Sequence, residues 1–109
     1  MKKLFSIVGV VTILFSGDVL AQNNEFKIVI KDHKFSPQNT EIPAQQKVKL
    51  IVENQDKTAE EFESYELNRE KIIGGGKSAV IFVGPLKPGV YKYFGEFNPK
   101  TAQGTITVK

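Results

Sequence analysis

Short segments in which apolar and polar residues alternate run along most of the chain. The alternation has a period of two in residues 26–31, 48–53 and 104–108, which is typical of β-strands with one buried face. Residues 78–83 are apolar and rich in β-branched side chains, as in a strand buried on both faces. Residues 90–94 follow the turn-forming pair Pro88-Gly89. These segments predict strands.

Turn signals separate the predicted strands. The prolines fall between or at the ends of the apolar segments, where a missing N–H does least harm: Pro37, Pro43, Pro85, Pro88 and Pro99. Tyr91, three residues after Pro88, is a candidate tyrosine corner. Only residues 63–71 have helical character. We therefore predict an all-β sandwich or barrel of about seven short strands, with a short helix near residues 63–71.

The N-terminal segment has the pattern of a secretory signal peptide. Met1-Lys2-Lys3 is basic, residues 4–15 are largely apolar, and Val19-Leu20-Ala21 places small residues at the −3 and −1 positions of a cleavage site. The apolar run is short for a membrane span, which makes an uncleaved anchor the weaker alternative. We predict a signal peptide over residues 1–21, one domain over residues 22–109, and a periplasmic protein whose mature form does not span the membrane.

Composition excludes several classes of site. The chain has no cysteine and one histidine, and its only methionine is Met1. A disulfide framework, a thiolate zinc site, an iron–sulfur cluster, a cysteine nucleophile and a type 1 copper centre are therefore excluded. The net charge of +3 is too weak to indicate a nucleic-acid partner.

Acidic residues gather in one part of the chain. Five glutamates lie within eleven residues: Glu60, Glu61, Glu63, Glu66 and Glu70. If the segment is a strand, Glu61 and Glu63 share one face while Phe62 points into the core. Two neighbouring carboxylates suit a hard cation such as Mn, Fe or Ca. The alternative is a solvated acidic helix, since Glu63, Glu66 and Glu70 also have helical spacing.

The C-terminal part resembles the last hairpin of the cupredoxin family. The segment Pro88-Gly89-Val90-Tyr91-Lys92-Tyr93-Phe94-Gly95-Glu96-Phe97-Asn98-Pro99, followed by residues 104–108, is similar to the family pattern Pro-Gly-x-Tyr-x-Tyr-x-Cys-x-x-His-Pro-x-Met before a final strand. Phe35-Ser36-Pro37 and Ile42-Pro43 also agree. The resemblance covers residues 25–109 and implies a Greek-key β-sandwich.

The copper ligands of the family do not carry over. Gly95 stands at the cysteine position, Asn98 at the second histidine, and Thr101, or Ala102 or Gln103 in a shifted alignment, at the methionine. The first histidine position falls on Glu60 or Glu61. The resemblance therefore implies either an oxygen-rich site or a vestigial one.

A narrower resemblance concerns iron uptake. The strings Glu60-Glu61-Phe62-Glu63-Ser64, Gly95-Glu96-Phe97 and Thr101-Ala102-Gln103-Gly104 are similar to cupredoxin-like domains associated with bacterial periplasmic iron uptake. This similarity implies a copper or iron site made of Glu61, Glu63 and Glu96, with His33 as a fourth ligand if its loop lies at the same end.

The implied partner is an inner-membrane iron permease or another periplasmic uptake component. Carboxylates favour the higher oxidation state of iron, which is compatible with an accessory role in Fe(II) oxidation, but metal binding and delivery fit the ligands better than turnover as an enzyme. The rival hypothesis is a metal-free interaction module that docks an envelope partner through its acidic edge and the loop around Phe97. The alternative for His33 is an ordinary surface histidine, which is the commoner role of a lone histidine in a loop. A homodimer is a further alternative for the partner.

Overall fold

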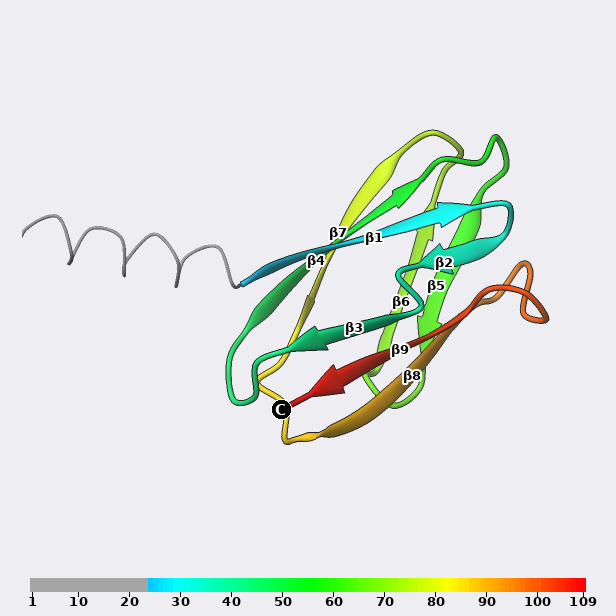
Figure 1. Ribbon diagram of the computed structural model, residues 1–109. Helices are drawn as coiled ribbons and strands as arrows, with labels where there is room; N and C mark the ends of the chain where they lie inside the picture. Colours follow the sequence, from blue (N-terminus) through cyan, green and yellow to red (C-terminus); the bar gives the residue numbers. More distant parts are fainter. Residues whose placement is uncertain (1–23) are drawn as a thin grey trace, which may run out of the picture.

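The computed structural model describes residues 24–109, which form a sandwich of two β-sheets (Figure 1). The described part contains nine strands and no helix: β1 Glu25–Lys31, β2 Lys34–Ser36, β3 Asn39–Ile42, β4 Val48–Asn54, β5 Glu60–Ser64, β6 Arg69–Ile73, β7 Ser78–Val83, β8 Gly89–Gly95 and β9 Gln103–Val108. The predicted all-β sandwich is confirmed. The predicted signal peptide lies outside the described residues. Within residues 24–109 there is no helix that could cross a membrane.

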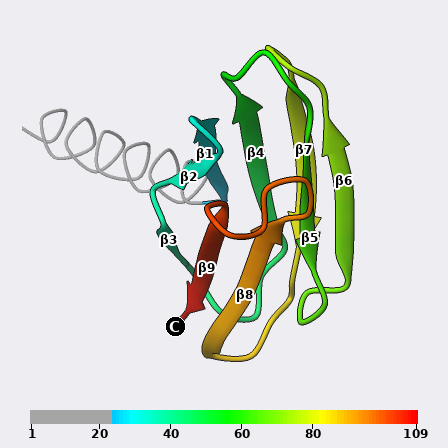
Figure 2. The ribbon, with the colours of Figure 1, turned by 90° about the vertical axis from the view of Figure 1, so that its right-hand side faces the viewer.

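The strands form one four-stranded and one five-stranded sheet. The orders are β2-β1-β4-β7 and β3-β9-β8-β5-β6, with parallel pairing of β1 with β4 and of β3 with β9. Figure 2 turns β8, β9 and the loop that joins them to the front. The β1–β2 turn, the β4–β5 loop and the β8–β9 loop lie at the same end of the sandwich, on the right of Figure 1. This end brings loop residues from both sheets together.

The alternation in the sequence decides which side chains fill the core. Ile28, Ile30 and Leu50 are fully buried, as their period of two predicts. Phe62 and Tyr93 stack at the centre, with ring centroids 4.6 Å apart, and the ring of Phe35 meets Tyr93 edge-on at 4.8 Å. These aromatic contacts join the two sheets. The predicted tyrosine corner is also present, since the Tyr91 hydroxyl donates to Lys87 O at 2.8 Å.

The short helix predicted near residues 63–71 is wrong. Residues 60–64 form β5, a turn follows, and Arg69–Ile73 form β6. Phe62 packs into the core and imposes the strand period, while Asn68 adopts a left-handed conformation (φ 55°) that reverses the chain. Core packing outweighs the helical spacing of the glutamates. The described part has nine strands where about seven were predicted, and the shortest are β2 and β3, with three and four residues.

The sequence predicted that the strand over residues 78–83 is buried on both faces, and this prediction is wrong. β7 is an edge strand, and its Val80 and Phe82 side chains are 44% and 46% exposed. Arg69, on the edge strand of the other sheet, donates from Nε to Phe82 O at 2.7 Å. This bond ties the two edge strands together.

Candidate metal centre

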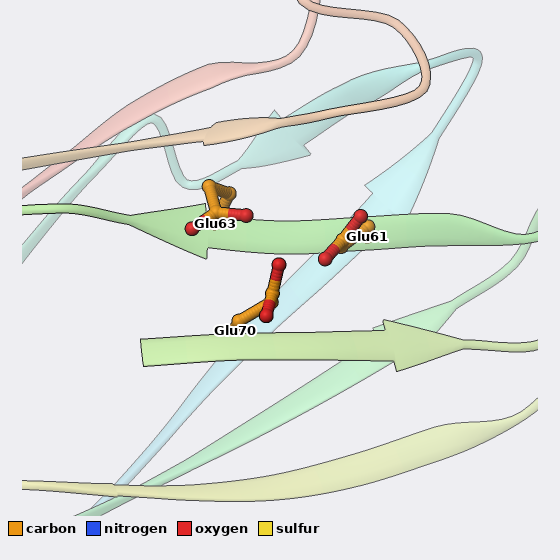
Figure 3. A group of neighbouring side chains, drawn as sticks. All are labelled: Glu61, Glu63 and Glu70. Carbon is orange, nitrogen blue, oxygen red and sulfur yellow. The ribbon is translucent and has the colours of Figure 1, made fainter. Parts of the chain in front are cut away.

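Three glutamate carboxylates converge on the outer face of the five-stranded sheet (Figure 3). Glu61 and Glu63 project from β5, and Glu70 projects from β6, directly opposite Glu63 in the antiparallel register. One carboxylate oxygen from each of the three lies within 4.8 Å of the others. Phe62, between the first two, points to the core. We call Glu61, Glu63 and Glu70 the carboxylate cluster.

No lysine, arginine or histidine within residues 24–109 forms a salt bridge with the carboxylate cluster. Glu61 is also largely shielded from solvent, since it is only 8% exposed. Like charges placed opposite each other in a sheet repel. The cluster therefore favours a proton or a cation between its oxygens.

The pKa values of the cluster reflect this repulsion. A hydrogen bond with Glu70 is the largest influence that raises the pKa of Glu61 to about 7, followed by burial and by the charges of Glu70, Glu63 and Glu96. Burial, then the hydrogen bond with Glu70 and the charges of Glu70 and Glu96, raise the pKa of Glu63. A perturbed group of this kind marks a candidate functional site.

Glu96 lies beside the carboxylate cluster. Its backbone N–H donates to Glu61 O at 2.9 Å, and the β5–β8 register, continued by one residue, sets Glu96 opposite Glu61. The Glu96 charge raises the pKa of both Glu61 and Glu63. The structure thus places Glu96 next to Glu61, and the role of Glu61, Glu63 and Glu96 as metal ligands stays a prediction.

His33 is placed elsewhere. It lies in the β1–β2 turn, where both Asp32 and His33 have positive φ and donate their backbone N–H groups to the Asp56 carboxylate, at 2.7 and 3.0 Å. The His33 Nδ1 is 3.6 Å from Asp56 Oδ2. The hydrogen bond from the His33 backbone is the main influence that lowers the pKa of Asp56. The partner of His33 is thus Asp56 and not the carboxylate cluster.

Glu70 is the member of the cluster that the sequence analysis did not select as a ligand. Because a helix was expected over residues 63–71, the contact of Glu70 with Glu63 was not predicted. Only a pair of strands places Glu70 opposite Glu63. A turn of four residues between two short strands would have given the same register. The missed signal is Asn68, a residue type that tolerates the left-handed conformation of such a turn.

A pocket opens next to the carboxylate cluster. Its volume is about 390 Å³ and its lining includes Glu63, Glu70, Tyr65 and Asn68. A metal ion at the cluster could therefore keep water or another small ligand on this side. Open coordination of this kind suits binding and release more than a closed structural site.

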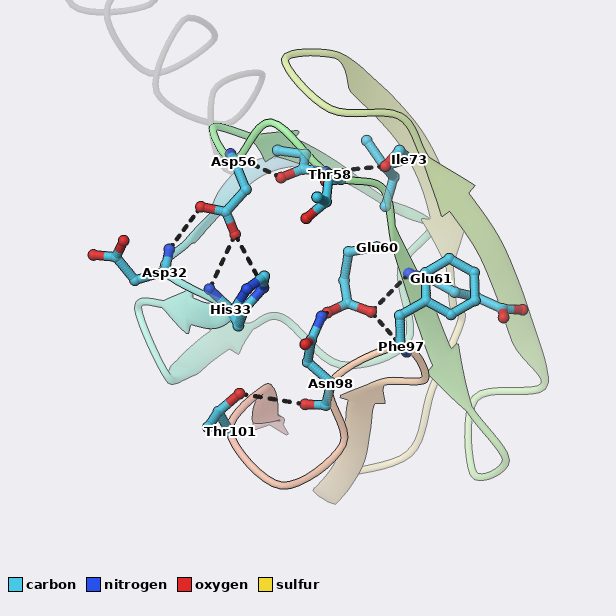
Figure 4. Close-up of polar contacts among 11 residues, drawn as sticks. Asp32, His33, Asp56, Thr58, Glu60, Glu61, Ile73, Phe97, Asn98 and Thr101 are labelled. Atoms are coloured by element: carbon cyan, nitrogen blue, oxygen red, sulfur yellow. Dashed lines mark hydrogen bonds and ion pairs between the residues drawn. The ribbon is translucent and has the colours of Figure 1, made fainter.

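A different group of residues occupies the end of the sandwich where the resembled family holds its copper (Figure 4). Glu60, the first residue of β5, is 1% exposed and its side chain points inward, unlike that of Glu61. A Cβ atom added to Gly95 would lie 2.6 Å from Glu60 Cδ and 2.6 Å from Ala102 Cβ. The position of the family's cysteine therefore has no room for a side chain, and a type 1 copper ion does not fit here.

The comparisons with known proteins agree with the fold. The family model of the cupredoxin-like domain matches residues 4–108. An uncharacterized protein of Rickettsia prowazekii (strain Madrid E) is 54% identical over 84 residues, which cover 77% of this chain and 67% of that protein.

Among solved structures, a purple cupredoxin from Nitrosopumilus maritimus is similar, with a TM-score of 0.59 and 24% identity over 76% of this chain and 98% of that one. Auracyanin from Roseiflexus castenholzii has a TM-score of 0.63 and 13% identity over 79% and 97% of the two chains. The metal-binding domain of the Cu(I)-exporting P-type ATPase of Streptococcus pneumoniae D39 has a TM-score of 0.66 and 16% identity over 78% and 84%. At these identities the likeness concerns the fold alone.

Proposed function

The chain belongs to the cupredoxin-like domain family, and we propose that it binds a hard divalent metal ion at Glu61, Glu63 and Glu70 on the outer face of the five-stranded sheet. The observation that carries the proposal is the convergence of the three carboxylates within 4.8 Å around Glu61, which is nine-tenths buried. Carboxylate oxygens are the ligands of Mg, Ca, Mn and Fe(II), whereas Cu(I) prefers sulfur and imidazole.

The proposal extends to the handling of ferrous iron. The resemblance of Glu60-Glu61-Phe62-Glu63-Ser64 to iron-uptake domains supports delivery of iron, or of copper as the second choice, to an inner-membrane iron permease or another periplasmic component. Carboxylates stabilise Fe(III) more than Fe(II), because the harder ion gains more from charged oxygens. A periplasmic location, with residues 1–21 as a signal peptide, is part of this proposal.

A second candidate function is a metal-free interaction module. Two large apolar side chains are exposed near the carboxylate cluster, Tyr65 at 77% and Ile72 at 61%. A partner with a basic patch beside an apolar one would fit such a surface, and its binding would weaken with salt. Metal dependence separates this candidate from the first.

Calorimetric titration of the metal-stripped protein with Mn(II), anaerobic Fe(II) and Cu(II) tests the proposal. We expect micromolar or tighter binding and a higher melting temperature, because a ligand selective for the folded state stabilises it. Glu61→Gln and Glu70→Gln should each weaken binding of Mn(II) roughly tenfold or more.

Glu41→Gln is the matched control, because Glu41 is an exposed carboxylate of the same sheet that pairs with Lys109 at 3.1 Å. It should leave Mn(II) binding unchanged. Absence of heat and of a melting shift with all three metals would rule out the metal site and leave the interaction module. Equal weakening by Glu41→Gln would mean nonspecific binding to surface charge.

A further inference from the structure

Glu60 is a buried carboxylate that connects β5 with the β8–β9 loop. Its Oε1 accepts hydrogen bonds from Glu61 N and Phe97 N, both at 2.9 Å, and its Oε2 accepts one from Asn98 Nδ2 at 2.8 Å (Figure 4). A buried carboxylate is unfavourable unless donors surround it. Here both oxygens have donors, and two of the three donors come from the β8–β9 loop.

These bonds determine where the start of that loop lies. Glu96 N donates to Glu61 O, and the next N–H along the chain, that of Phe97, donates to Glu60 Oε1. The loop then closes on itself, because Asn98 N donates to Gly95 O and Ala102 N donates to Asn98 O. The backbone of Glu96 is thus held on one side by β5 and on the other by the Glu60 carboxylate.

The side chains of Glu60 and Glu96 lie on opposite faces of the five-stranded sheet. The Glu60 side chain points to the core, whereas Glu96 lies opposite Glu61, close enough for its charge to influence Glu61 and Glu63. Gly95, directly before Glu96, has no side chain, and the Glu60 carboxylate packs against the space that a Cβ would take. The loop therefore depends on Glu60 for its packing and for its polar contacts.

We propose that Glu60 is a positioning residue of the metal site: from the core side of β5, its carboxylate holds Glu96 beside Glu61, Glu63 and Glu70. The inference rests on the proposed metal-binding function and adds a fourth carboxylate, Glu96, together with the residue that places it. Glu60 itself does not contact the metal.

The positioning of the loop is measurable without metal. In Glu60→Ala, Phe97 N–H loses its acceptor, and hydrogen exchange of this amide should accelerate roughly tenfold or more, since bonds to charged acceptors are the stronger ones. Glu60→Gln keeps a neutral acceptor at the same place and should give a smaller acceleration. It also provides a second variant if Glu60→Ala does not fold. Unchanged exchange of the Phe97 amide in both variants would overturn the inference.

A double-mutant cycle with Mn(II) tests whether Glu60 acts through Glu96. Glu96→Gln should weaken Mn(II) binding roughly tenfold in the wild-type background. In the Glu60→Ala background, and in part in Glu60→Gln, the same substitution should have little further effect, because Glu96 is already displaced. Glu63→Gln is the control, and it should weaken binding equally in all backgrounds because β5 alone places Glu63.

The outcomes separate the two hypotheses. If the wild type binds Mn(II) but Glu96→Gln has the same effect with and without Glu60, the positioning role is overturned and the proposed function stands. If the wild type binds no Mn(II), the proposed function fails and the inference fails with it. Loss of Glu96 dependence together with full Glu63 dependence supports both.

Discussion

Replacement of Gly95 by alanine tests the packing of the Glu60 carboxylate against β8. The added Cβ would lie 2.6 Å from Glu60 Cδ, 2.6 Å from Ala102 Cβ and 2.7 Å from Glu60 Oε2. Ordinary contacts begin near 3.4 Å, so each neighbour has to recede by several tenths of an ångström. The Ala102 Cβ is attached directly to its backbone, whereas the Glu60 carboxylate is the end of a flexible side chain, so the carboxylate is the group that moves.

The expected loss of stability has two parts. Overpacking of a buried site typically costs about 1–3 kcal/mol. Displacement of the Glu60 carboxylate also weakens its bonds to Phe97 N and Asn98 Nδ2, and charge-assisted bonds contribute about 1.5–3 kcal/mol each when lost completely. Because relaxation will preserve part of both, we expect Gly95→Ala to lower the free energy of unfolding by about 3 kcal/mol.

Urea denaturation followed by circular dichroism measures this loss. Gly74→Ala is the control, since the nearest atom to its new Cβ is the flexible Lys77 Cδ at 3.3 Å, and the change should stay within about 0.5 kcal/mol. In a Glu60→Ala background, Gly95→Ala should cost at least about 1 kcal/mol less than in the wild type. A Gly95→Ala protein as stable as Gly74→Ala would refute the packing of Glu60 against residue 95.

Three further predictions concern titration and burial. The raised pKa of Glu61, about 7, means that its contribution to the stability of the metal-free protein is complete below about pH 4.5 and is lost as the pH rises through 7; Glu70→Gln should flatten this decline in melting temperature measured from pH 5 to 8.5. The pKa of Asp56 is lowered, chiefly by the hydrogen bond from His33 N, so its contribution is present at neutral pH and disappears as the pH falls below the ordinary carboxyl range; Asp56→Ala should destabilise the protein by about 1–2 kcal/mol in urea at pH 7 and much less at pH 3. The Tyr93 hydroxyl is buried without a partner in the described part of the chain, so Tyr93→Phe should leave the free energy of unfolding unchanged or raise it by about 1 kcal/mol, and a clear loss of stability would show that the hydroxyl is satisfied in solution.

Most of the fold was predictable because its signals are local. Period-two alternation in residues 26–31 and 48–53 gives the buried faces of β1 and β4, and the Tyr91 corner follows from the turn before it. The edge position of β7 was not predictable from composition. An apolar, β-branched segment is typical of a strand buried on both faces, whereas in a sandwich of two sheets only one face of each strand meets the core, and Val80 and Phe82 lie on the other.

The candidate site was predictable only in part. The outward direction of Glu61 and Glu63 followed from the strand period once Phe62 was assigned to the core. The position of Glu70 opposite Glu63 depends on a turn and on the strand register. The local sequence is equally compatible with an acidic helix. The inward direction of Glu60 follows from the same period, but its hydrogen-bond donors lie in the loop after β8, which the sequence does not place relative to β5.

The bond between Arg69 and Phe82 O has a consequence for the solubility of the protein. A strand at the edge of a sheet presents unused carbonyl and N–H groups that can recruit a strand of another molecule, and β7 adds exposed Val80 and Phe82 side chains to that hazard. The Arg69 guanidinium occupies one of these carbonyls and places a positive charge over the edge. The Arg69 side chain thus links the two sheets, and its charge opposes the pairing of β7 with a strand of another molecule.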